Sequence, residues 1–172
     1  MKWLSNRKLF SFIALLVLII VLINRHFGNT SIINNVINKT KRIELYKYVS
    51  SHFSNPQNDK RVILVINEGI CENNLFLVYK LISEFNSNYI NLIINSPYVR
   101  YIKPINKIYT TSKAKGVQLY IDWEDNFSKI FPFEGLPLIL LYDDNKITGG
   151  FYLQGYDYDK AITSLSVFVT NN

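Results

Sequence analysis

The sequence predicts an α/β domain with a mixed β-sheet, preceded by an N-terminal transmembrane helix. Residues 62–66 form a continuous apolar run, as expected for a strand that is covered on both faces. A short turn with the only cysteine of the chain, Cys71, follows this run, and a helical pattern follows the turn. Two later apolar runs flank a polar turn and predict an antiparallel hairpin. A long apolar run near the N-terminus predicts the membrane helix.

The distribution of charge separates the two ends of the chain. The chain of 172 residues has a net charge of +6, but residues 1–61 carry +8 and residues 62–172 carry −2. A nucleic-acid-binding domain is expected to carry its basic excess on the folded part, so we expect no nucleic-acid partner. A single cysteine excludes an internal disulfide and any cysteine-rich metal site. We therefore expect no metal and no cofactor.

The N-terminal segment predicts a membrane anchor. Residues 1–8 form a basic flank, and residues 9–24 form the expected transmembrane signal anchor. The apolar run at 9–23 spans roughly 22 Å as a helix, and snorkelling by Lys8 and Arg25 extends its reach toward the ~30 Å hydrocarbon core. A cleaved signal peptide is the alternative, but no small-x-small cleavage site follows.

The flanking charges predict the orientation of this anchor. Basic residues are concentrated before the apolar run, whereas Arg25 alone follows it before Lys39. The positive-inside rule then predicts a single-pass membrane protein with a cytoplasmic N-terminus and a periplasmic or extracellular domain.

Residues 25–60 form the expected juxtamembrane connector, partly helical. Apolar residues recur at helical spacing from Ile32 to Ile37 and again from Ile43 to Val49. Two interpretations stay open: a helix that packs on the domain or on a partner helix, and a helical spacer. The polar stretch at 54–60 breaks the pattern, so the domain is expected to span residues 61–172.

The folded domain is predicted to alternate strands and helices. Strands are expected at 62–66, 89–94, 117–122, 138–142 and 147–153. The first helix is expected to begin at a cap formed by Asn73 or Asn74, and Asp122 is expected to cap a short helix that ends at Phe131. Residues 96–116 are expected to form a loop with some helix, residues 143–146 a turn, and residues 157–169 the last helix. The first strand–helix–strand unit requires two parallel strands joined by a right-handed crossover. The antiparallel hairpin that follows would make the sheet mixed.

Two local features make this order resemble the thioredoxin fold. The first is the cysteine directly after a buried strand, in INEGIC at 66–71, and the second is a Gly-x-Pro segment before the fourth strand, in FEGLPLIL at 133–140. The resemblance covers residues 61–172. Together with the anchor, it is similar to the membrane-tethered bacterial thiol–disulfide oxidoreductases.

This resemblance implies a three-layer sandwich and a site at the start of the first helix. Cys71 would be the nucleophile, and the binding groove would be formed by Glu72, Asn74, Leu136 and Pro137. The resemblance also implies a cis peptide bond at Pro137.

The chain departs from the pattern of this family at one decisive position. The family carries C-x-x-C, whereas this chain has Asn74 where the second, resolving cysteine should stand. Dithiol exchange passes through a mixed disulfide that the second thiol resolves, so here resolution would need an outside thiol. The position of Cys71 at a helix N-terminus favours the thiolate, and the nearby Glu68 and Glu72 oppose it.

Two functions stay open at this point. The residue chemistry favours a degenerate, non-catalytic module that binds a protein partner, with Cys71 as a small, half-buried apolar residue. The resemblance favours a monothiol redox protein, which as an enzyme would be a thiol–disulfide oxidoreductase. The sequence does not determine the oligomeric state.

A basic stretch that contains no acidic residue offers a second candidate surface. It is formed by Arg100, Lys103, Lys107, Lys113 and Lys115. Two interpretations stay open: a solvated loop, and a docking site for an acidic partner or anionic lipid. Neighbouring acidic residues at 122–125 and 143–144 are explained by caps and turns.

Overall fold

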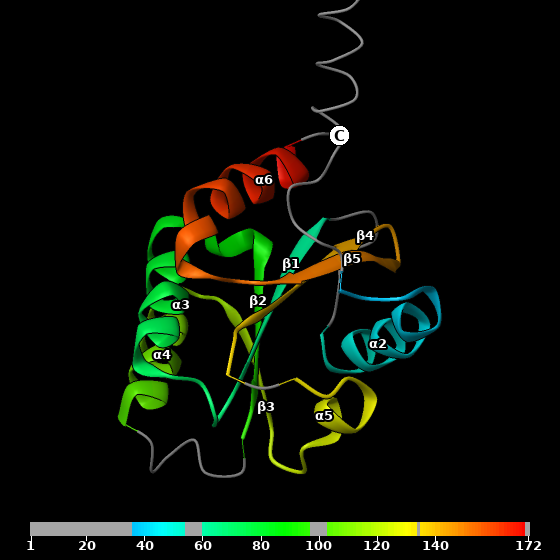
Figure 1. Ribbon diagram of the computed structural model, residues 1–172, viewed down its shortest axis with the longest axis horizontal. Coiled ribbons are helices and arrows are strands. Elements are labelled where there is room, and N and C mark those ends of the chain that lie inside the picture. Colours follow the sequence, from blue (N-terminus) through cyan, green and yellow to red (C-terminus); the bar gives the residue numbers. More distant parts are fainter. Residues whose placement is uncertain (1–35, 54–59, 97–102, 134, 171–172) are drawn as a thin grey trace, which may run out of the picture. The chain divides into compact units, whose positions relative to one another are not determined.

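A computed structural model describes residues 36–53, 60–96, 103–133 and 135–170 (Figure 1). These residues form a five-stranded mixed sheet in the order β3-β2-β1-β4-β5. The strands β1, β2 and β3 are parallel, and β4 is antiparallel to β1 and β5 to β4. The strands are β1 (Arg61–Asn67), β2 (Ile90–Asn95), β3 (Gln118–Asp122), β4 (Leu138–Asp143) and β5 (Lys146–Tyr152).

Helices cover both faces of this sheet, which gives the expected three layers. Figure 1 shows α3, α4 and α6 on one side and α2 and α5 on the other. The helices of the described chain are α2 (Lys39–His52), α3 (Glu72–Glu84), α4 (Lys103–Ala114), α5 (Asn126–Ile130) and α6 (Tyr158–Thr170), with short 3₁₀ turns at Ser87–Tyr89 and Gly155–Asp157.

The central strands form because their side chains are buried on both faces. Every residue of β2 is buried, as are the five central residues of β1. Val65 pairs with Ile93 on one side and with Leu138 on the other, so the core extends across the sheet without a break. Burial of continuous apolar runs is the pattern expected for parallel strands between two helical layers.

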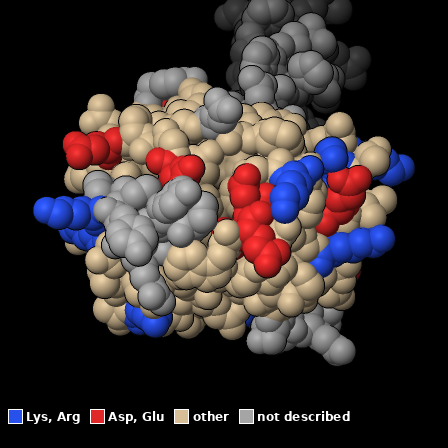
Figure 2. Space-filling view, turned by 90° about the horizontal axis from the view of Figure 1, so that it is seen from below, with Lys and Arg blue, Asp and Glu red and all other residues tan. Residues whose placement is uncertain are grey.

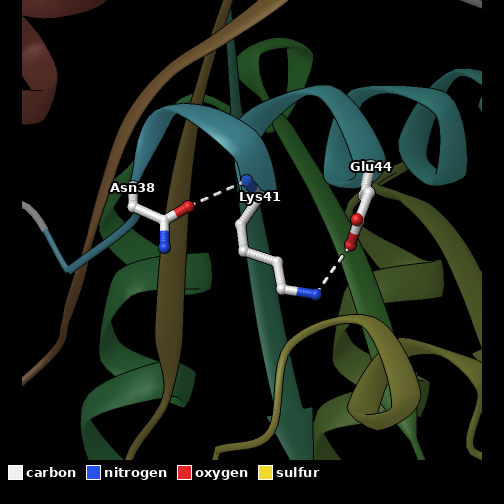
Figure 3. A network of polar contacts seen from close by, with 3 residues as sticks. All are labelled: Asn38, Lys41 and Glu44. Atoms are coloured by element: carbon white, nitrogen blue, oxygen red, sulfur yellow. Dashed lines mark hydrogen bonds and ion pairs between the residues drawn. The ribbon is translucent and has the colours of Figure 1, made fainter.

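The connector helix is part of the folded domain. Asn38 caps α2 by accepting a hydrogen bond from the backbone N–H of Lys41 at 2.9 Å, and the Lys41 ammonium pairs with Glu44 at 2.7 Å (Figure 3). Leu45 and Val49 are fully buried in the core beneath the helix. The compact unit spans residues 34–172 and therefore begins earlier than the expected boundary at residue 61. Of the two interpretations of the connector, the structure shows a helix that packs on the domain.

The segment before α2 is held against the last strand by a glycine. The backbone N–H of Val36 donates to the carbonyl of Gly150 at 2.9 Å. A Cβ at position 150 would overlap the Cδ1 of Ile37 and would stand 2.8 Å from the carbonyl oxygen of Ile139. The close approach of Ile37 to β5 therefore requires glycine at this position.

A buried carboxylate joins α2 to α5. The Oδ2 atom of Asp122 accepts hydrogen bonds from the Tyr48 hydroxyl and from the backbone N–H of Phe127, each at 2.7 Å. Burial raises the pKa of Tyr48, and the hydrogen bond to Asp122 raises it further. Asp122 is the expected cap of the short helix; its side chain does accept an N–H from the first turn of α5, but the N-cap residue is Asp125 and the helix ends at Ile130.

The segment at 96–116, which is expected to be a loop with some helix, is helical from Lys103 to Ala114. Residues Lys103–Ala114 form α4, in which Ile105 and Ile108 are buried and the lysines face outward. Pro104 lies in the first turn, where proline is tolerated because its missing N–H has no helical acceptor. Residues 97–102 lie outside the described residues.

The hairpin turn is confirmed with its expected chemistry. Asp144 and Asn145 both have positive φ, at 46° and 61°, which is the geometry of a type I′ turn.

None of the helices within the described ranges is long and apolar enough to cross a membrane. The predicted anchor at 9–24 lies outside those ranges, as do the flank at 1–8 and the first part of the connector.

Candidate functional site

Cys71 stands at the N-terminus of α3, at the carboxyl end of the central strand. It is the N-cap residue, and its carbonyl accepts the N–H of Leu75 at 3.0 Å, but its side chain makes no capping bond. The helix begins at Glu72, so the expected cap at Asn73 or Asn74 is wrong. The thiol is free and the residue is exposed, which excludes its interpretation as a half-buried apolar residue.

Asn74 links α3 to the segment that precedes β4. Its Nδ2 atom donates to the carbonyl oxygen of Gly135 at 2.6 Å. Asn67, the last residue of β1, donates in the same way to the carbonyl of Phe133 at 2.8 Å. Two asparagine amides therefore hold both flanks of residue 134, and the amide at the position of a resolving thiol has a structural role.

Pro137 leads into β4 but does not adopt the expected conformation. No peptide bond within the described ranges is cis, so the expectation of a cis bond before Pro137 is wrong. Pro137 is buried, and its carbonyl accepts the N–H of Leu153 at 2.8 Å, which extends the pairing of β4 with β5. Leu136 is half-buried. Gly135, two residues before Pro137, has a φ of +68°, in the left-handed region that favours glycine.

None of the predicted groove residues lines the cavity at the carboxyl end of the central strands. A cavity of about 550 Å³ lies at the carboxyl end of β1 and β2, but neither Cys71 nor Pro137 lines it. Glu72 faces a different recess, between α3 and α4. The described residues that line the cavity are Asn67, Glu68, Gly69, Asn95, Asp125, Ser128, Pro132, Phe133 and Gly135.

The wall of this cavity is a polar network that sequence reasoning missed. The Nδ2 atom of Asn95 donates to Asp125 at 2.5 Å and to Ser128 at 2.7 Å. The Oδ1 atoms of Asn67 and Asn95 are buried and have no hydrogen-bond partner among the described residues. The signal was an asparagine at the end of each of two apolar strands, which end side by side in a parallel sheet.

The charges at this end of the molecule are mixed. Figure 2 views the molecule from below the orientation of Figure 1 and shows acidic and basic side chains on the same face. Within the part of the chain that the structure describes, no three His, Cys, Asp or Glu side chains are placed to hold a metal ion.

Comparison with known proteins finds similarity in fold alone. No family model matches the chain, and no curated protein matches it. A candidate thioredoxin from Neisseria meningitidis is 12% identical with a TM-score of 0.47, over 67% of this chain and 78% of that one. The thioredoxin domain of a thiol-disulfide oxidoreductase from Bacteroides vulgatus is 16% identical with a TM-score of 0.41, over 63% and 80%.

A domain of a candidate thiol-disulfide isomerase from Cytophaga hutchinsonii is similar at the same level. It is 10% identical with a TM-score of 0.41, over 69% of this chain and 82% of that one. Identities and TM-scores of this size carry no inference about activity. The sheet order, the antiparallel hairpin and Cys71 after the central strand give the chain a thioredoxin-like α/β fold, with one cysteine at the site.

Proposed function

We propose that this chain is a membrane-anchored thioredoxin-like protein of the cell envelope that binds a protein partner and does not catalyse dithiol exchange. The observation that carries the proposal is the hydrogen bond from Asn74 to Gly135 at 2.6 Å. In a dithiol enzyme of this fold, a second thiol would occupy that position and resolve the mixed disulfide. An amide cannot do so, and here it holds the segment before β4.

A second function is favoured by the exposure of Cys71. As a thiolate, Cys71 could attack a client disulfide, form a mixed disulfide with one client sulfur and release the other as a thiolate. A low-molecular-weight thiol would then attack the mixed disulfide and regenerate Cys71. This reaction needs no second cysteine in the chain, but it needs that external thiol in the same compartment.

Trapping of partners in the native host distinguishes these functions. Cells are cross-linked or acid-quenched, blocked with maleimide, and the protein is purified and separated with and without reductant. The variants are Cys71→Ser, and Cys71→Ser combined with Ser164→Cys, which moves the single thiol to an exposed position on α6. A membrane-impermeant maleimide also tests whether the domain faces outward.

Recovery of the same cross-linked partner with wild type and Cys71→Ser supports the binding module. Reducible high-mass bands that need Cys71, and that Ser164→Cys does not restore, would instead establish the monothiol function. Absence of both kinds of complex would overturn both proposals. Protection of Cys71 from the impermeant reagent in intact cells would overturn the outward orientation.

A further inference from the structure

A recess between α3 and α4 combines apolar side chains with lysines. It has a volume of about 370 Å³, and the two helices lie side by side on one face of the sheet (Figure 1). Successive positions along one face of each helix supply its wall, because residues three and four apart are neighbours on a helix. The lining residues are Glu72, Leu75, Phe76, Tyr79, Lys103, Lys107 and Ile108.

Phe76 is the most exposed large apolar side chain in the described part of the chain. Its exposed fraction is 64%, whereas Leu75 beside it is 5% exposed and anchors the helix in the core. Tyr79 lies one turn further along α3, and the ammonium of Lys107 stands 4.7 Å from the centre of its ring. The recess is therefore lined by two aromatic side chains, with a lysine ammonium held against the ring of Tyr79.

All the charged residues of α4 are basic. Residues 103–121 contain four lysines and no acidic residue. Among the described residues, none of these lysines forms an ion pair, since the ion pairs there join Lys41 to Glu44 and Lys160 to Asp157. Of the described residues that line the recess, Glu72 is the one that is acidic. Lys103 and Lys107 are thus available to a negatively charged partner.

We infer that this recess binds an acidic segment of a partner protein that inserts one large apolar side chain beside Phe76 and places carboxylates against Lys103 and Lys107. The inference rests on the proposed partner-binding function and names the chemistry of the partner. A recess of this size fits a side chain, and desolvated lysine–carboxylate contacts would set its register. Glu72 follows Cys71 directly, so the bound segment lies along the helix that begins at the thiol.

An anionic membrane fits the same observations less well. Recognition of anionic lipid by basic residues typically needs a cluster of four to eight Lys or Arg. Here two lysines flank the recess, and Lys115 is engaged elsewhere, because its ammonium donates to the carbonyl of Ser83 at 2.6 Å. A concave aromatic recess also suits an inserted side chain better than a flat bilayer surface.

The test measures binding of labelled peptides to the full chain in nanodiscs of neutral phosphatidylcholine. The probe is the fluorescein-labelled peptide DEFDE, with DESDE and KKFKK as comparators, followed by fluorescence anisotropy. We expect DEFDE to bind more tightly than either comparator, and its affinity to fall as salt rises from about 0.05 M to about 0.5 M.

Matched variants separate the recess from general charge and apolarity. Lys103→Gln with Lys107→Gln should weaken DEFDE binding about tenfold. Lys113→Gln with Lys115→Gln removes the same charge near and just beyond the other end of α4, and should change binding less than about twofold. Phe76→Ser should abolish the preference of the protein for DEFDE over DESDE, and Val167→Ser, at a similarly exposed apolar position on α6, should leave it unchanged.

Three results of the binding measurements would overturn the inference. The first is equal binding of DEFDE and KKFKK, and the second is equal loss of binding in the two lysine pairs. The third is binding of the chain to nanodiscs with anionic lipid but not to DEFDE, which would assign the lysines to a membrane. If Phe76→Ser still recovers the cross-linked partner in cells, partner binding stands and only its location in this recess fails.

Discussion

The two faces of the sheet are built from different chemistry. On the α2–α5 face, Tyr48, Asp122 and Phe127 close the layer with buried hydrogen bonds, and edge-to-face rings surround them. On the α3–α4 face the apolar side chains that these two helices bury are aliphatic, and Phe76 and the lysines of α4 are exposed to solvent. The first face depends on a specific polar network for its stability, whereas the second keeps exposed apolar and charged groups at the surface.

This difference teaches which residues can be changed without loss of the fold. A buried polar group costs stability when its partner is removed, because the remaining group is left desolvated and unpaired. An exposed side chain meets water in both the folded and the unfolded state and contributes little. Changes on the α2–α5 face should therefore reduce stability, and changes on the α3–α4 rim should alter recognition alone.

The largest effect is expected from Asp122→Ala. The substitution removes two hydrogen bonds to a carboxylate and leaves the Tyr48 hydroxyl buried without an acceptor, so we expect a loss of about 3 kcal/mol in the free energy of unfolding. Urea unfolding of the chain in neutral detergent measures it. Tyr48→Phe is the control, with a smaller loss of about 1 kcal/mol, and the double variant should lose less than the sum. Additive losses would show that the two groups are not coupled.

The pH dependence of stability tests the buried hydrogen bond between Tyr48 and Asp122 in a second way. Burial and the bond to Asp122 raise the pKa of Tyr48, so the native state keeps this proton at a pH where the unfolded state, with a tyrosine pKa near 10, has lost it. The contribution of Tyr48 is therefore complete below about pH 10 and is lost as the pH rises further. Stability should fall above about pH 10 less steeply in Tyr48→Phe than in wild type.

The difference in slope should approach ~1.4 kcal/mol per pH unit. Other tyrosines in the described part of the chain have a pKa that burial raises, and they remain in the variant, so its stability should still decline; they are Tyr120, Tyr152 and Tyr158. Parallel curves for the two proteins above about pH 10 would contradict the assignment of Tyr48 to a buried, hydrogen-bonded site.

The smallest effect is expected from Phe76→Ser. The side chain is 64% exposed, so the free energy of unfolding should change by less than about 0.5 kcal/mol. The measurement is the same urea titration, with Leu75→Ser as the contrasting variant, because Leu75 is 5% exposed and its loss leaves a cavity. A large loss in Phe76→Ser would show that this rim belongs to the core, and the contrast between the two faces would fail.

The sequence determined the elements whose signals are local. The buried strands follow from continuous apolar runs, and the hairpin from a polar turn between two such runs, because burial and turn conformation are both encoded in adjacent residues. The position of the cysteine after the central strand and the absence of a second thiol also follow from the order of the residues alone.

The tertiary structure decided what depends on residues far apart in the chain. The exposure of Cys71, the attachment of Asn74 to Gly135 and the trans bond before Pro137 depend on how α3 meets the segment before β4, and no local pattern encodes that contact. α2 packs on the domain through contacts with residues far along the chain, among them Asp122, which lies 74 positions from Tyr48. Spacing along one segment shows which side chains share a face, whereas the partner of that face is chosen by packing.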